Sequence, residues 1–257
     1  MARSPSAPSI PKHGKDTWRT PPEVLFLIHR IYGGPDVPEV APMWQPEWWR
    51  LPNWKALYLE MLAWLRAQGT IAQDPCADQD EAFHYAKCST ALLGRDPLFP
   101  WDLGGVFANV PYSCIKAWVE HGAQQAQLLR ESRRCARRGI LYLIPATPTN
   151  NYWVDSLLCP GQPQHPFGPG TNLFATKRGR IGFIGPDGPV KNNPMGSALV
   201  GWIDPALGDH AVAELEAAGW VVHRRPAPPP RLGVEDGVVV LYTDGETLAL
   251  RDPCATP

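Results

Sequence analysis

The most informative part of the sequence is residues 105–113, which read Gly105-Val106-Phe107-Ala108-Asn109-Val110-Pro111-Tyr112-Ser113. The first four residues form an apolar run, which is typical of a short buried strand. An amide side chain, a proline-stiffened turn and an aromatic ring follow it. The amide oxygen and the next backbone carbonyl can both accept hydrogen bonds from one amino group, and the ring offers a stacking face. This stretch therefore predicts a small, rigid mouth at a sheet edge that suits a flipped nucleobase.

Apolar runs and helical patterns alternate on both sides of this strand. The patterns predict strands at 70–73, 91–93, 105–108, 140–144, 173–177, 180–184 and 199–203, and helices at 23–31, 53–68, 80–88, 115–138 and 210–218. Thr20 is expected to cap the first helix, and Gly69 to end the second. The runs at 173–177 and 180–184 are expected to form a hairpin. Strands that alternate with helices indicate an α/β sheet with helices on both faces.

The composition of the chain divides it into segments. Residues 1–15 are rich in Ser, Pro and Lys and are expected to be disordered. One domain is expected over 16–223, with a Trp-rich insertion at about 35–69 whose rings either cover the core or contact DNA or another subunit. Residues 224–231 predict a stiff proline-rich linker. A small appendage over 232–257 follows it, with a hairpin in its middle.

Charge and cysteine usage narrow the class of protein. The formal net charge is −1, so a nucleic-acid partner would require the basic residues to gather on one face. The six cysteines show no Cys-x-x-Cys pair, and neither a zinc site nor a disulfide framework is expected. The seven histidines are scattered and are interpreted as structural. No apolar run approaches the roughly 20 residues that span a bilayer, and the N-terminus lacks an apolar signal core, so an intracellular protein is expected.

Six segments occur in an order that resembles one family. They are residues 16–23, 74–77, 109–113, 144–147, 180–183 and 196–200. Over roughly 16–203 the chain is similar to the phage-type (Dam-like) DNA N6-adenine methyltransferases, with Val110 where the Asn/Asp-Pro-Pro-Tyr signature has its first proline. The resemblance implies a Rossmann-like class I methyltransferase sheet with helices on both faces. It also implies S-adenosylmethionine as cofactor, double-stranded DNA as partner, and the cytoplasm of a bacterial or phage-infected cell.

The resemblance also implies a set of cofactor-binding residues. They are Trp18, Thr20, Pro21, Asp74, Pro75, Cys76, Ala77, Asp96 and Asn109. In this family the acid at the position of Asp74 faces the methionine part of the cofactor. The acid at the position of Asp96 bonds the adenine amine, although Pro97 stands where glycine is usual. For the acid that binds the ribose, Asp78, Asp80 and Glu81 stay open as candidates.

The catalytic residues implied are Asn109, Val110, Pro111 and Tyr112. An adenine amine is a poor nucleophile because its lone pair is delocalised into the ring. Two acceptors, the Asn109 amide oxygen and the Val110 carbonyl, favour a more localised nitrogen as positive charge develops. Tyr112 is expected to stack on the flipped base. Valine at 110 keeps the carbonyl but loses the fixed φ of proline, which predicts a looser mouth.

DNA contacts are expected from residues beside this mouth. Those chosen are Tyr112, Ser113, Lys177, Arg178 and Arg180. A second basic group, Arg130, Arg133, Arg134, Arg137 and Arg138, is interpreted as the solvated end of a helix. Asn150 and Asn151 are candidates for the border of the target base.

Two alternatives to adenine methylation stay open. The same mouth fits any exocyclic amine, so N4-cytosine methylation is one of them. The other is a non-catalytic DNA-binding phage accessory protein that retains the fold.

Overall fold

The computed structural model describes residues 18–36, 48–78, 80–89, 105–112, 115–131, 139–146, 173–185, 188–190, 196–223, 231–235, 238–243 and 246–250. The chain divides into two compact units, Met1–His223 and Arg224–Pro257. The expected tail at 1–15 and the expected strand at 91–93 lie outside the described residues.

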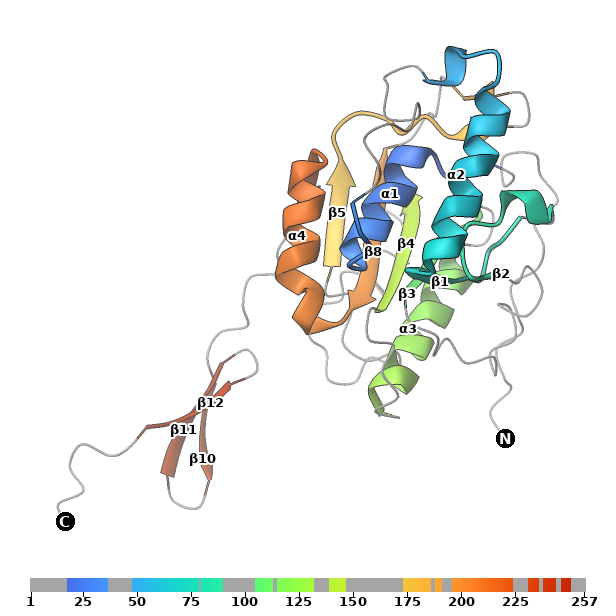
Figure 1. The fold of residues 1–257 in the computed structure, drawn as a ribbon. Helices are drawn as coiled ribbons and strands as arrows, with labels where there is room; N and C mark the ends of the chain where they lie inside the picture. Colours follow the sequence, from blue (N-terminus) through green and yellow to red (C-terminus); the bar gives the residue numbers. More distant parts are fainter. Residues whose placement is uncertain are drawn as a thin grey trace. The chain divides into compact units, whose positions relative to one another are not determined.

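The first unit is built on a seven-stranded mixed sheet (Figure 1). Its strands are β1 (Ile71–Asp74), β2 (Cys88–Ser89), β3 (Gly105–Asn109), β4 (Gly139–Pro145), β5 (Leu173–Lys177), β8 (Ser197–Ile203) and β9 (Trp220–Val222). Their order across the sheet is β2-β1-β3-β4-β8-β5-β9. The pairs from β2 to β4 are parallel, whereas β8 is antiparallel to both its neighbours and β9 is antiparallel to β5. The strands β1 to β5 therefore all end at one edge of the sheet, which we call the carboxyl edge.

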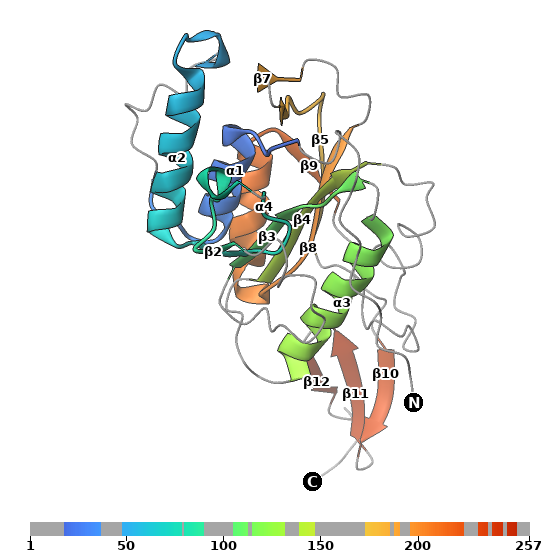
Figure 2. The same ribbon diagram turned by 90° about the vertical axis from the view of Figure 1, so that its right-hand side faces the viewer.

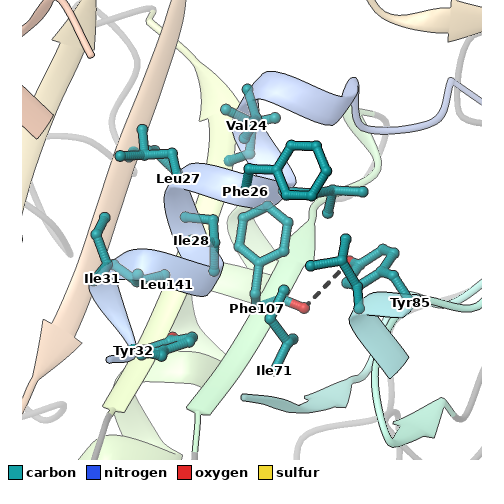
Figure 3. Packing of buried hydrophobic residues seen from close by; sticks show 14 of the residues in the cluster. Val24, Phe26, Leu27, Ile28, Ile31, Tyr32, Ile71, Tyr85, Phe107 and Leu141 are labelled. Carbon is teal, nitrogen blue, oxygen red and sulfur yellow. Dashed lines mark hydrogen bonds between the residues drawn. The ribbon is translucent and has the colours of Figure 1, made fainter. Parts of the chain in front are cut away.

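Helices cover both faces of this sheet, so the α/β prediction is confirmed. The helices α1 (Pro22–Ile31), α2 (Trp54–Gln68) and α4 (Gly208–Ala217) pack on one face, and α3 (Ile115–Glu131) lies on the other (Figure 2). Successive side chains of β3 point to opposite faces of the sheet and so belong to two different cores. Phe107 joins the core under α1 (Figure 3), whereas Val106 and Ala108 join the core under α3. Strands buried on both faces in this way have continuous apolar sequences, as β3 and β4 do.

Helix α1 fixes the position of β3. The Tyr32 hydroxyl, just beyond the helix, donates to the Val106 carbonyl at 2.6 Å. Its ring lies so close to Gly105 that a Cβ there would come within 2.6 Å of a ring carbon. On the same helix, the buried His29 ring donates from Nε2 to the Pro35 carbonyl at 3.0 Å and accepts from the Thr70 hydroxyl at 2.5 Å. This histidine is structural.

The described part of the Trp-rich segment expected as an insertion forms a short 3-10 helix, η3 (Trp48–Arg50), and then α2. Trp48 is buried, and its ring stacks on that of Tyr58 with centroids 6.0 Å apart. Trp49 and Trp54 pack half-buried against the same core. Gly69 ends α2 in the left-handed conformation at φ 67°, as expected from the sequence. These rings cover the core under α1 and α2.

Two local expectations are wrong. Thr20 does not cap α1, because the residue before the first helical residue is Pro21, which has no side-chain acceptor. Residues 80–88 do not form an α-helix. Only the single 3-10 turn η4 (Glu81–Phe83) forms, and the Lys87 amide then donates to the Ile71 carbonyl at 3.1 Å. Pairing with β1 therefore keeps this segment extended.

The expected hairpin between 173–177 and 180–184 is also wrong. Both edges of β5 are already paired, with β8 and with β9. The chain turns away at Gly179, which has a φ of 80°. Residues 184–185 instead form β6 (Ile184–Gly185), which pairs with β7 (Gly188–Pro189) in a small separate sheet.

The second unit contains a three-stranded antiparallel sheet. Its strands are β10 (Arg231–Glu235), β11 (Val238–Thr243) and β12 (Glu246–Leu250). The pair β11–β12 corresponds to the expected hairpin, and β10 adds a third strand. Strand β10 begins at Arg231, the last residue of the expected linker.

Candidate functional site

The carboxyl edge contains a point where the strand order reverses. Strand β1 is followed along the chain by β2 on one side, whereas β3 is followed by β4 on the other. Ligands of open α/β sheets bind beyond the carboxyl ends of the strands at such a point. Asp74 is the last residue of β1, and Asn109 is the last residue of β3. The two residues singled out by the sequence therefore end the two strands that flank the reversal.

The Asp74 carboxyl is enclosed at this edge. Its side chain is buried, and the Cys76 amide donates to its Oδ1 at 2.9 Å. Burial raises the pKa of this carboxyl to about 7, and hydrogen bonds from the Cys76 amide and the Tyr85 hydroxyl oppose the shift only in part. Tyr85 also reaches β3, since its hydroxyl lies 3.5 Å from the Phe107 carbonyl (Figure 3). The acid thus gains or loses its proton near neutral pH and is linked through Tyr85 to the second strand of the site.

Asn109 and Val110 are held by different contacts. The Asn109 side chain is half-buried, and its Nδ2 donates to the Trp18 carbonyl at 2.7 Å. Val110 is buried, and its amide donates to the Leu143 carbonyl of β4 at 3.2 Å. A proline at 110 could not make this second bond. The turn after β3 is therefore tied to β4.

Residues 18–20 cross the edge as an extended segment, which we call the N-terminal strap. The Arg19 amide donates to the Ile184 carbonyl at 2.8 Å, and the Ile184 amide donates back at 3.0 Å. The Trp18 ring stacks on Phe183 with centroids 6.0 Å apart. The Tyr112 ring meets Phe183 edge-on at 6.4 Å. The strap, the 181–184 segment and the turn after β3 therefore meet in one place.

The remaining predicted cofactor residues have varied surroundings. Pro21, Pro75 and Ala77 are buried, and Cys76 is half-buried beside the α3 core. Thr20 is buried, and its hydroxyl has no hydrogen-bond partner among the residues that the structure describes. Asp96 lies outside the described residues.

The three candidates for the ribose acid differ in their contacts. Asp78 forms an ion pair with Arg19, and Asp80 accepts from the Ala82 amide at 3.0 Å to cap η4. Glu81 is exposed. Arg19 itself was missed by sequence reasoning, because nothing in the local pattern indicates a partner 59 residues away.

The predicted DNA-contacting residues divide into two kinds. Lys177 ends β5, where its Nζ donates to the Ala218 carbonyl at 2.5 Å and lies 5.8 Å from the centre of the Trp220 ring. It therefore holds the C-terminal end of α4. Arg178 and Arg180 follow it at the same edge and are exposed. Ser113, Asn150, Asn151 and the side chains of the basic group at 130–138 lie outside the described residues.

Comparisons with protein-family models, with curated proteins and with solved structures give no match to this chain. Within the described part of the chain, no cluster of three or more His, Cys, Asp or Glu side chains is arranged to hold a metal ion. The helices described here are too short or too polar to cross a bilayer. Function is therefore inferred from the geometry of the carboxyl edge and from the motifs that meet there.

Proposed function

We propose that this chain is an S-adenosylmethionine-dependent DNA methyltransferase that modifies the N6 amine of adenine, on a sheet of the Rossmann-like class I type. The observation that best supports the proposal is the position of Asp74 and Asn109. They end adjacent parallel strands at the reversal of strand order, where the ligands of such sheets bind. Two motifs separated by 35 residues in sequence thus share one edge.

Residues of β1 and of the strap fit the cofactor. The cofactor supplies a methyl group on a positively charged sulfonium. Asp74 offers a carboxyl whose charged form a nearby cation, such as the ammonium of the methionine part, would favour. Thr20 offers a buried hydroxyl that has no partner among the described residues, and such a group normally requires one. Together, this carboxyl and this hydroxyl suit the amino-acid end of S-adenosylmethionine.

The last residue of β3 and the turn that follows it fit the target amine. The Nδ2 of Asn109 is used by the Trp18 carbonyl, so its Oδ1 is the end of the amide that accepts from the amine. The Val110 carbonyl is the second acceptor, and together they stabilise the charge that develops on the nitrogen. Tyr112 offers a stacking face worth about 1–3 kcal/mol for one base. Arg178 and Arg180 are exposed at the same edge, and we expect them to contact phosphates.

The experiment is incubation of the protein with methyl-labelled S-adenosylmethionine and mixed-sequence double-stranded DNA, followed by identification of the labelled base by mass. We expect label on N6 of adenine. Asn109→Ala should abolish turnover and leave the cofactor affinity measured by calorimetry nearly unchanged. Asn53→Ala is the matched control, because Asn53 is exposed and its side chain makes no capping hydrogen bond to α2.

Three outcomes would contradict the proposal in different ways. Label on N4 of cytosine would establish the alternative target amine. A lack of cofactor binding at millimolar concentration would favour the non-catalytic DNA-binding protein. Full turnover by Asn109→Ala would refute the role given to its carboxamide.

A further inference from the structure

The N-terminal strap is fastened by a side chain of its own. The Arg19 Nε donates to Asp78 Oδ2 at 2.8 Å, and its guanidinium carbon lies 3.4 Å from the centre of the Phe83 ring. Both charged side chains are largely shielded, with 20% and 23% of their surfaces exposed. The guanidinium group is planar. Its face stacks on the ring while its edge bonds the carboxylate, so the two contacts together hold the arginine side chain in one orientation. Arg19 therefore anchors the strap to the loop that follows β1.

The inserted helix α2 provides a second anchor. The Tyr58 hydroxyl donates to the Thr20 carbonyl at 2.7 Å. Tyr58 is buried under Trp48, whose ring stacks on it. A hydroxyl on a packed ring has little freedom to move, so the carbonyl that it bonds is fixed as well. The insertion thus reaches the candidate site through the hydrogen bond from Tyr58 to the strap.

The strap in turn fixes the Asn109 carboxamide. Trp18 presents a carbonyl oxygen to Nδ2 of that side chain at 2.7 Å. A carbonyl only accepts, so a half-turn of the amide would bring two oxygens together and lose the bond. The position of the strap therefore selects one of the two orientations of the amide. In that orientation Oδ1, rather than Nδ2, is directed away from the strap.

We propose that the strap sets the orientation of the Asn109 carboxamide, and that Arg19 and Tyr58 are positioning residues that act through it. The catalytic consequence rests on the proposed function, in which Oδ1 accepts from the target amine. Each anchor lies on a different part of the fold, at Asp78 after β1 and at Tyr58 on α2. The site is then preorganised only when the insertion, the loop after β1 and the strap are all in place.

The test that does not depend on activity uses the side-chain amide of Asn109 in ¹⁵N-labelled full-length protein. Its NH₂ signal is assigned by its absence in Asn109→Ala. In the wild type we expect this NH₂ group to be protected from exchange with solvent. Tyr58→Phe removes one hydrogen bond of about 1 kcal/mol, so protection should fall by about fivefold. Arg19→Met should lower it at least as much, and Arg19→Lys, which keeps the charge, should restore part of it.

Arg66→Met is the matched control, because Arg66 is an exposed arginine in the last turn of α2. It should leave the Asn109 signal unchanged. Unaltered protection in a folded Tyr58→Phe or Arg19→Met protein would overturn the inference. Tyr58→Phe keeps the ring and its packing, so it decides the question even if the arginine variant does not fold.

Turnover separates this inference from the proposed function. If both hold, Tyr58→Phe and Arg19→Met should each lower kcat by about fivefold or more. Lost protection in the variants of a protein that transfers no methyl group would keep the inference and reject the proposed function. Methyl transfer by the wild type with unaltered protection in the variants would support the proposed function and reject the inference about the strap.

Discussion

Replacement of Asp74 by asparagine should remove most of the pH dependence that this residue gives to the stability of the fold. Burial raises the pKa of its carboxyl from 3.8 to about 7 in the folded protein. At 1.36 kcal/mol for each pH unit, this difference corresponds to about 4 kcal/mol. The side chain is 3% exposed, so solvent screening reduces that figure little. Since the asparagine NH₂ group would itself be buried, about 4 kcal/mol is an upper bound on the gain.

The sign of the effect follows from proton binding. Between pH 3.8 and about 7 the folded protein keeps the proton on Asp74, whereas the unfolded chain has lost it. Stability therefore falls as the pH rises through this range, and the full cost is present above pH 7. Below pH 3.8 both states are protonated and the carboxyl costs nothing.

Asparagine keeps the shape of the side chain and the oxygen that accepts from the Cys76 amide, and it carries no charge. Urea unfolding followed by tryptophan fluorescence at pH 4, 5, 6, 7 and 8 measures the difference between variant and wild type. We expect Asp74→Asn to be more stable at pH 8 by up to about 4 kcal/mol, and the pH-dependent part of this difference should vanish near pH 4. The exposed Asp209→Asn controls for the loss of one negative charge. A difference that does not change with pH would refute the reasoning.

Three further predictions concern the same edge. Gln73 is buried, and neither end of its amide is hydrogen-bonded among the described residues. Gln73→Met should therefore stabilise the fold by about 1–3 kcal/mol, and a loss of stability in urea unfolding would contradict this. Lys177→Met loses the bond to the Ala218 carbonyl and should lower Tm by about 2–4 °C, whereas an unchanged Tm in calorimetry would remove its structural role. The double variant Arg178→Ala with Arg180→Ala should keep the wild-type Tm and reduce the slope of log Kobs for DNA against log salt by up to about 1.8; an unchanged slope would show that neither contacts phosphate.

Much of the sheet could be predicted because its central strands are buried on both faces. Such strands require continuous apolar runs, and those at Gly105–Asn109 and Gly139–Pro145 stand out from their polar surroundings. The helix Trp54–Gln68 was equally clear, since its buried residues recur at helical spacing and Gly69 ends it. Asp74 and Asn109 could be placed at one edge because the ends of parallel strands coincide.

The strap could not be predicted, because its contacts join residues that are distant in sequence. The bonds of Arg19 to Asp78, of Asn109 to Trp18 and of Tyr58 to the Thr20 carbonyl span 59, 91 and 38 residues. Local patterns contain no information on such pairs. The 80–88 segment failed for a related reason. Its helical pattern is overridden by pairing with β1, a contact that only the folded chain provides.

Val110 stands where the signature that this stretch resembles has its first proline, and contacts elsewhere in the fold hold it in place. Proline at this position would fix φ without help from the rest of the protein. Valine leaves φ free in the isolated chain but adds an amide, and that amide bonds the Leu143 carbonyl of β4. Its side chain is 1% exposed and packs in the core under α3, so a rotation of the turn would require both the bond and the packing to break. A proline would restrict the backbone through its own ring. Here the contact between β3 and β4 restricts it instead. The geometry of the turn after β3 thus depends on the intact sheet, in the same way that we propose the orientation of Asn109 to depend on the strap.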